Sequence, residues 1–168
     1  MSDPWNFAGP VTQVAGAAGT VTLVDESTFA ISDGAGDMTT GSAQGLFFRD
    51  MRVLSRLEVL VDGVRAEALA AVNEDPFSST FVSRCPPPPG RADSTLMVFR
   101  SRYVGQGMRE DVTIRNFGDE PTFFRLEVFV AADFADLFAV KEGRVGAPSG
   151  SALPSAATTR PNVLSTWR

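Results

Sequence analysis

Apolar and polar residues alternate with a period of two along much of the chain, which is typical of half-buried β-strands. In the range 124–130 every second residue is apolar, and Arg125 and Glu127 lie between them. Other short segments are rich in β-branched and aromatic residues and also predict strands. These segments are Thr20–Val24, Thr28–Ile31, Gly45–Phe48, Val53–Val61, Ser79–Ser83, Thr95–Val104 and Met108–Asn116.

Turn residues separate the predicted strands. Asp62-Gly63 directly follows one of them and is typical of a two-residue β-hairpin turn. A second turn follows Asn116, so we expect Met108–Asn116 and Thr122–Ala131 to pair as an antiparallel hairpin. We expect Asp133–Phe138 to close with a helical turn.

Short strands with turn signals between them, and no long helical pattern, predict an all-β fold, an antiparallel β-sandwich. Ala66–Val72 fits either a short helix or a strand. Residues 1–19 are rich in Gly, Ala and Pro and predict a flexible lead. Residues 143–168 are rich in Pro, Ser and Ala and predict a flexible C-terminal tail or linker. The sandwich domain is therefore expected over residues 20–142.

Composition and charge narrow the class of protein. The 168 residues are 43% hydrophobic and 21% charged, which fits one globular domain with a core. A net charge of -5 argues against nucleic acid or an anionic membrane as partners. The most apolar stretch, 123–140, is interrupted by four charges and predicts no membrane span. Cys85 is the single cysteine, which excludes an internal disulfide and fits a cytoplasmic protein.

The sequence offers little for metal or nucleophilic chemistry. Because it contains no histidine, it holds no Ser-His or Cys-His nucleophile system and no histidine metal site. Asp33 and Asp37, with glycines between them, resemble half of a calcium loop. Calcium takes about 6–8 oxygen ligands, so a glycine turn is favoured. We expect no cofactor and no metal.

Glycosidases use a pair of carboxyl groups, one as acid and one as base or nucleophile. Glu110 and Asp111 are neighbours on a strand, so their side chains point to opposite faces and cannot share a substrate. Asp133 and Asp136 share a face if their turn is helical. Ion pairing with arginines or helix capping is the favoured interpretation of that second pair, and we predict no catalytic residue.

Two charged clusters, Arg49–Arg52 and Arg109–Asp111, lie at predicted strand ends. Each suits either a buried ion network or interface, or a solvated hairpin face. Both alternatives stay open at this stage. The charged residues of these clusters, together with Asp133 and Asp136, are the candidates for an interface or for shaping a cleft. The candidates are Arg49, Asp50, Arg52, Arg109, Glu110, Asp111, Asp133 and Asp136.

Six motifs occur in the order typical of one family: Thr28–Asp33, Gly36–Asp37, Gly45–Arg56, Asp75–Phe77, Arg109–Asn116 and Ala132–Phe138. Together they resemble the N-terminal domain of bacterial glycogen-debranching-type enzymes, the amylo-α-1,6-glucosidase family. The resemblance covers about residues 20–142. It implies a super-sandwich-like β-sandwich that precedes an (α/α)6 toroid, and it places the glycosidase's acid and base on that toroid.

The resemblance implies a non-catalytic module that packs on the catalytic (α/α)6 domain of a glycoside hydrolase and helps to shape its α-glucan cleft. That domain is the expected partner, with α-glucan as a second one. Two alternatives remain, a stand-alone carbohydrate-binding β-sandwich and a truncated fragment with no independent activity.

Overall fold

The computed structural model describes residues 13–15, 19–87, 90 and 93–145. Its elements are β1 (Gln13–Ala15), β2 (Val21–Asp25), β3 (Thr28–Ser32), β4 (Gly45–Phe48), β5 (Met51–Leu54), β6 (Arg56–Val61), β7 (Val64–Arg65), β8 (Glu67–Asp75), β9 (Ser78–Arg84), β10 (Leu96–Val104), β11 (Met108–Asn116), β12 (Leu126–Ala131), β13 (Ala135–Asp136) and α1 (Leu137–Lys141). No helix in this described part is long and apolar enough to cross a membrane.

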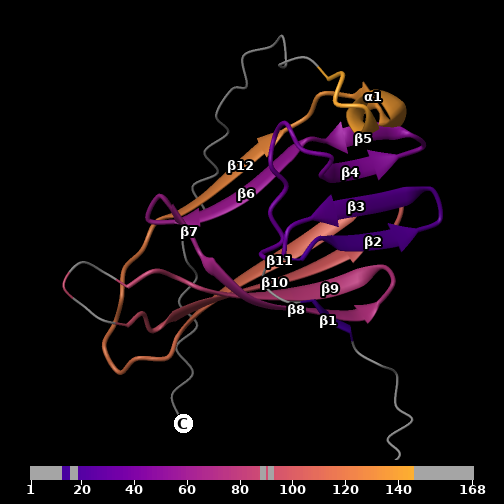
Figure 1. Cartoon of the computed structure of the whole chain (residues 1–168). Helices are drawn as coiled ribbons and strands as arrows, with labels where there is room; N and C mark the ends of the chain where they lie inside the picture. Colours follow the sequence, from indigo (N-terminus) through magenta and orange to yellow (C-terminus); the bar gives the residue numbers. More distant parts are fainter. Residues whose placement is uncertain (1–12, 16–18, 88–89, 91–92, 146–168) are drawn as a thin grey trace, which may run out of the picture.

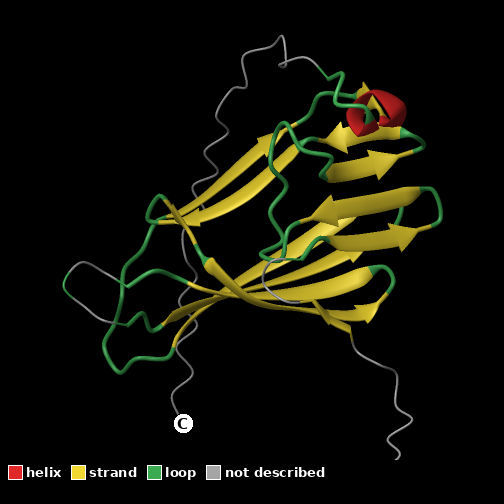
Figure 2. Ribbon diagram, viewed as in Figure 1, coloured by secondary structure: helices red, strands yellow, loops and turns green. Residues whose placement is uncertain are grey.

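The strands form two facing layers. One layer is an antiparallel sheet with the order β1-β8-β9-β10-β11. The other contains two antiparallel sheets, β13-β5-β4-β3-β2 and β12-β6-β7, which lie above the first layer in Figure 1. Figure 2 shows how strands dominate both layers and how the short helix sits at one corner. The all-β sandwich predicted from the alternation is confirmed.

The core lies between the layers and has two clusters. The larger one joins β2, β3, β4 and β6 to β8, β9 and β10 through Leu23, Leu57, Phe81 and other buried residues. The smaller one joins β6 to β10 through Val61 and Val98. Each cluster draws residues from both layers, because alternating strands present one apolar face toward the other layer.

The hairpin predicted at Asp62-Gly63 is confirmed. These two residues link β6 to β7 with φ angles of 53° and 76°. Positive φ at both central positions is the conformation of a type I′ turn, which matches the right-handed twist of the two strands. Of the ambiguous segment 66–72, residues 67–72 belong to strand β8.

The hairpin predicted between Met108–Asn116 and Thr122–Ala131 is wrong. β11 pairs with β10, and β12 crosses to the other layer and pairs with β6. The tight turn at 105–107 gives β11 a nearer partner in β10, while Asp62 holds Arg125 at the start of β12. Alternation shows which face of a strand is apolar, but it does not say which strand lies beside it.

The ends of the predicted domain differ in detail from expectation. The helical turn begins at Leu137, later than expected, because Ala135 and Asp136 first pair with β5. Strand β1 falls inside the predicted flexible lead and pairs with β8. The rest of that lead up to residue 18, and the predicted tail from residue 146, lie outside the described residues.

Candidate functional site

Two arginines lie in the buried row of β10. The strand alternates so that Arg100 and Arg102 face the opposite layer together with Val98 and Val104. Their side chains are 3% and 1% exposed. A buried guanidinium is costly unless a carboxylate pairs with it and its N–H groups are hydrogen-bonded. The stability of the sandwich therefore depends on the partners of these two side chains.

Glu110 and Asp37 supply the balancing charges. Glu110, on the neighbouring strand, lies opposite Arg102 and bridges both arginines. Its Oε1 is 2.5 Å from Nε of Arg100, and its Oε2 accepts from Nε of Arg102 at 2.7 Å. Asp37 Oδ1 is 2.5 Å from Nη1 of Arg100. Two carboxylates thus neutralise two guanidinium groups inside the sandwich.

Backbone carbonyls of the turn after β3 complete the arginine contacts. The carbonyl oxygens of Ala35 and Gly36 each accept a hydrogen bond from Arg100 at 3.0 Å. The Gly36 oxygen also accepts from Nη2 of Arg102 at 2.5 Å. The turn therefore binds two side chains of the opposite layer, and it fixes how the two layers meet.

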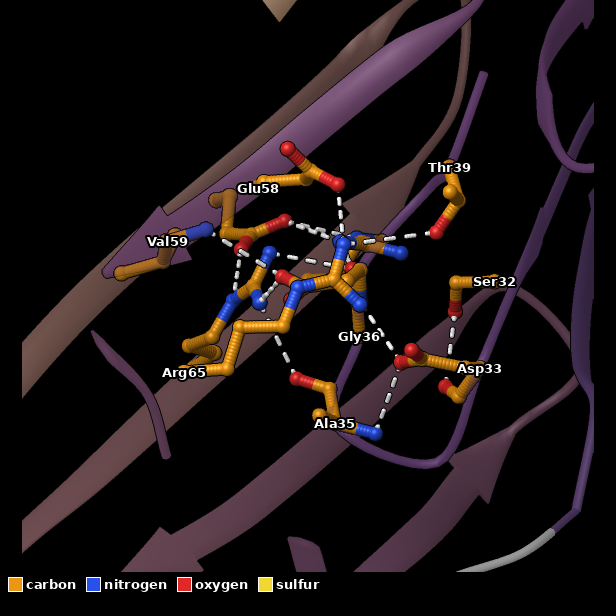
Figure 3. Close-up of polar contacts among 12 residues, drawn as sticks. Ser32, Asp33, Ala35, Gly36, Thr39, Glu58, Val59 and Arg65 are labelled. Atoms are coloured by element: carbon orange, nitrogen blue, oxygen red, sulfur yellow. Dashed lines mark hydrogen bonds and ion pairs between the residues drawn. The ribbon is translucent and has the colours of Figure 1, made fainter. Parts of the chain in front are cut away.

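Asp33 shapes this turn from within. Its Oδ1 accepts hydrogen bonds from the backbone N–H of Ala35 at 2.9 Å and of Asp37 at 2.8 Å. Figure 3 shows Asp33 and Ala35 on this turn. The geometry is that of the favoured glycine turn. In the described ranges no group of three or more His, Cys, Asp or Glu side chains is arranged to hold a metal ion.

Gly36 is required by both its backbone and its surroundings. Its φ is +85°, and a Cβ there would lie 2.8 Å from the ring of Phe81. That ring is fully buried, and the guanidinium carbon of Arg102 lies 4.9 Å from its centroid. The glycine lets the turn approach the ring on which the arginine packs.

The network continues toward the β6–β7 hairpin. Arg65 lies 3.6 Å from Oδ2 of Asp37 and pairs with Glu58, which also binds Arg56. Figure 3 shows Arg65 and Glu58 reaching toward the turn that holds Gly36. The charges of β6 and β7 thereby join those of β10 and β11.

Burial perturbs two groups of the network. It raises the pKa of Asp37, while the Arg100 guanidinium acts in the opposite direction. It lowers the pKa of Arg102, and Glu110 opposes that shift. Nη1 of Arg102 is buried and finds no hydrogen-bond partner among the described residues. Each buried charge of the network is thus stabilised by a partner of opposite charge, and this opposes the cost of burial.

Sequence reasoning missed most of this network. It selected Glu110 but not its partners Arg100 and Arg102. A signal for them exists, because both arginines occupy the apolar register of a strand in which Val98 and Val104 hold the neighbouring inward positions. A charged residue in an inward row needs a buried partner of opposite charge.

A second buried pair joins Arg52 and Asp133, both selected from the sequence. Nε of Arg52 donates to Oδ1 of Asp133 at 3.1 Å, and its Nη1 donates to the carbonyls of Ser42 and Gln44. Asp136 instead accepts from two backbone N–H groups and caps α1. Ion pairing and helix capping therefore account for the two aspartates that were considered as a catalytic pair.

The other selected residues are exposed. Arg109 pairs with Asp111 at 2.9 Å on the outer face of β11, away from Glu110. Arg49 and Asp50 form the β4–β5 turn, where both have positive φ angles. Each predicted cluster thus combines a buried ion pair with solvated side chains.

A shallow depression lies among the hairpin tips at one end of the sandwich. Its volume is about 280 Å³, and it is lined from the β2–β3, β4–β5 and β10–β11 turns by Asp25, Glu26, Ser27, Thr28, Phe48, Arg49, Gly105 and Gln106. Figure 1 shows the first two of these turns at the right-hand end of the upper layer. The depression presents both donors and acceptors of hydrogen bonds.

The fold and these contacts define an all-β sandwich domain whose interior carboxylates are bound by arginines. The family model for the N-terminal domain of some glycogen debranching enzymes matches residues 23–166, and the chain belongs to this family. This confirms the resemblance seen in the motifs, and the match continues past Glu142. A search of curated proteins gives no match.

The buried bridge predicts unequal roles for two adjacent carboxylates. Glu110→Gln leaves Arg100 and Arg102 short of a balancing charge and should lower the free energy of unfolding by about 3–5 kcal/mol. Asp111→Asn, on the exposed face, is the matched control and should change it by less than about 0.5 kcal/mol. Urea denaturation measures both. Equal effects would contradict the role given to Glu110.

The Gly36–Phe81 contact predicts a second difference. Gly36→Ala and Gly41→Ala both place a side chain at positive φ, at a cost of about 1–2 kcal/mol. Nothing lies near Gly41, whereas at Gly36 overpacking against Phe81 should add about 1–3 kcal/mol. Thermal and urea unfolding of the two variants give the difference. If Gly36→Ala costs no more than Gly41→Ala, the close contact does not constrain the turn.

Proposed function

We propose that this domain is a non-catalytic module of an amylo-α-1,6-glucosidase-type debranching enzyme. It packs on the catalytic (α/α)6 domain and helps to shape the cleft that receives α-glucan. The membership of the family supports the enzyme context. The observation that carries the non-catalytic role is that the interior carboxylates are bound by arginines.

A glycosidase needs one carboxyl group that can give up a proton and a second one about 5–9.5 Å away. Glu110 has each oxygen bound to a different arginine, and Asp133 is bound by Arg52. The oxygens of these carboxylates are occupied by guanidinium N–H groups inside the fold, so they are not free to contact a glycosidic oxygen or a water. Asp136 is occupied by the helix N-terminus. These groups are therefore suited to holding the fold rather than to hydrolysis.

The hairpin tips support a contact role. Glu26, Arg49 and Asp50 adopt left-handed backbone angles, which cost a non-glycine residue roughly 1–2 kcal/mol each. The two-residue β4–β5 turn requires these angles, as the Asp62-Gly63 turn does, and so holds the side chains at its tip in defined positions. The three side chains are exposed at one end of the sandwich, and they are suited to contact a neighbouring domain or the sugar in its cleft.

The cytoplasm is the compartment that we propose. Cys85 is free and buried, and burial raises the pKa of its thiol. A thiol of this kind needs no oxidising environment.

The isolated chain should release no glucose or oligosaccharide from limit dextrin. Incubation of the pure protein with phosphorylase limit dextrin, followed by chromatography of the products, tests this, with an active debranching enzyme as positive control. Turnover that copurifies with the chain through successive columns and disappears in Glu110→Gln at a temperature where that variant stays folded would overturn the non-catalytic role.

A stand-alone carbohydrate-binding domain is the second candidate. The depression at the hairpin tips favours it, because Arg49, Gln106 and the neighbouring carboxylates can donate to and accept from sugar hydroxyls. A module that only completes the cleft of another domain should bind free sugar poorly, since most of the contacts come from the partner.

Titration with maltoheptaose separates the two candidates. We expect the isolated chain to give no saturable heat in the low millimolar range by calorimetry. Saturable binding that Arg49→Ala abolishes and Arg109→Ala leaves intact would favour the stand-alone binder. Arg109 is the matched control because it is an exposed arginine outside the depression.

A further inference from the structure

Strand β12 has an uncovered apolar row. Leu126, Val128 and Val130 are 37%, 39% and 54% exposed. Their partners on β6 are Val61, Val59 and Leu57, which lie on the same face and are only 3%, 6% and 8% exposed. The inner face of the sandwich is therefore covered under β6 and open under β12. Among the described residues β12 has a neighbouring strand on one side only.

The backbone of β12 also leaves hydrogen-bonding groups free. The N–H of Asp62 donates to the carbonyl of Arg125 at 2.8 Å, so Arg125 directs its carbonyl toward the β6 side. In an antiparallel ladder the direction alternates. Leu126, Val128 and Val130 therefore direct their N–H and C=O groups toward the open edge. Neither lysine nor proline guards this edge, although both are usual ways of preventing strand addition.

Edge strands β2 and β11 lack this combination. The inward residues Val21 and Leu23 of edge strand β2 are buried. The inward row of edge strand β11 carries Glu110, and its Val112 and Ile114 pack on the smaller core cluster. An apolar inner row, free backbone groups and the absence of a guarding residue coincide at β12.

We propose that a second copy of this chain pairs with β12, strand against strand and antiparallel, about a two-fold axis at Leu126. This register places Arg125 of each copy opposite Glu127 of the other. Opposite charges directly across an antiparallel pair are stabilising, and like charges are destabilising. An axis at Glu127 places two glutamates together, and an axis at Val128 leaves the charges without partners. Charge complementarity thus selects Leu126.

The same register joins the apolar rows. Leu126 packs against Leu126 of the second copy, and Val128 lies opposite Phe124, which is itself exposed. The sheet becomes continuous through β6, β12 and the two matching strands of the second copy. An interface of this kind is isologous and closes as a dimer. The inference goes beyond the proposed function and does not depend on it.

Sedimentation velocity of the full chain tests the association. We expect a concentration-dependent shift from 17.9 kDa toward twice that mass. Val128→Lys places a charge in the row and should weaken the dimer by at least about tenfold. Val24→Lys, at an exposed valine on edge strand β2, is the matched control and should leave it unchanged. A monomer at every concentration, or equal weakening by both variants, overturns the proposal.

Cysteine cross-linking tests the register. At the two-fold axis the two copies of residue 126 form a hydrogen-bonded pair with their Cα atoms about 5.5 Å apart, within reach of a disulfide. The two copies of residue 128 are offset by roughly 13 Å along the strands. Leu126→Cys should therefore give a disulfide dimer under mild oxidation, and Val128→Cys should not. The wild-type chain, whose Cys85 is buried, is the control. Equal or reversed yields overturn this register.

A charge exchange distinguishes cross-strand pairing from non-specific hydrophobic association. Glu127→Arg sets two arginines opposite each other and should weaken the dimer by about tenfold. Adding Arg125→Glu restores opposite charges and should restore the dimer. If the double variant stays as weak as the single one, the proposed charge pairing is wrong.

Discussion

The sandwich depends on a charge balance between its layers. Arg100 and Arg102 leave water on folding, and Asp37, Glu110 and the carbonyls of the turn after β3 replace that water. Hydrophobic contacts give the layers affinity for each other but little orientation, because they are non-directional. Guanidinium groups accept partners only along the directions of their N–H bonds. The arginines therefore fix how the turn and β10 are placed, and the apolar clusters pack around that arrangement.

Interior and exposed charges have different roles throughout the domain. Interior charges are bound to one another, whereas exposed charges and strained turns gather where hairpins meet solvent. This arrangement is well suited to a member of a family of N-terminal enzyme domains, because a rigid body can present a defined end to a neighbour. The uncovered row of β12 shares no residue with the lining of the depression at the hairpin tips, so the contacts proposed for the two places involve different side chains.

Sequence patterns predicted the strands, the sandwich and the family because each of them is encoded by short segments: alternating residues, turn residues and motifs. They did not predict that β12 crosses to pair with β6, since pairing is decided by which edge is free when the layers assemble. From the sequence, Glu110 is identified as part of a charged cluster at a strand end, and Asp133 as one of a pair of carboxylates. The pairing of Glu110 with Arg100, and of Asp133 with Arg52, became evident only in three dimensions, because a salt bridge across 81 residues, such as that of Arg52 with Asp133, leaves no local pattern.

The long sequence separation within the charge network has a consequence for biosynthesis. Asp37 and Arg100 are 63 residues apart, and the arginine emerges from the ribosome well after the turn that it binds. Until then the aspartate has no buried counter-charge and stays hydrated, so the early strands cannot close over it. The charge network is therefore complete only once β10 and β11 are available, and contacts of such long range leave the first half of the chain open to chaperones and to misassembly while synthesis continues.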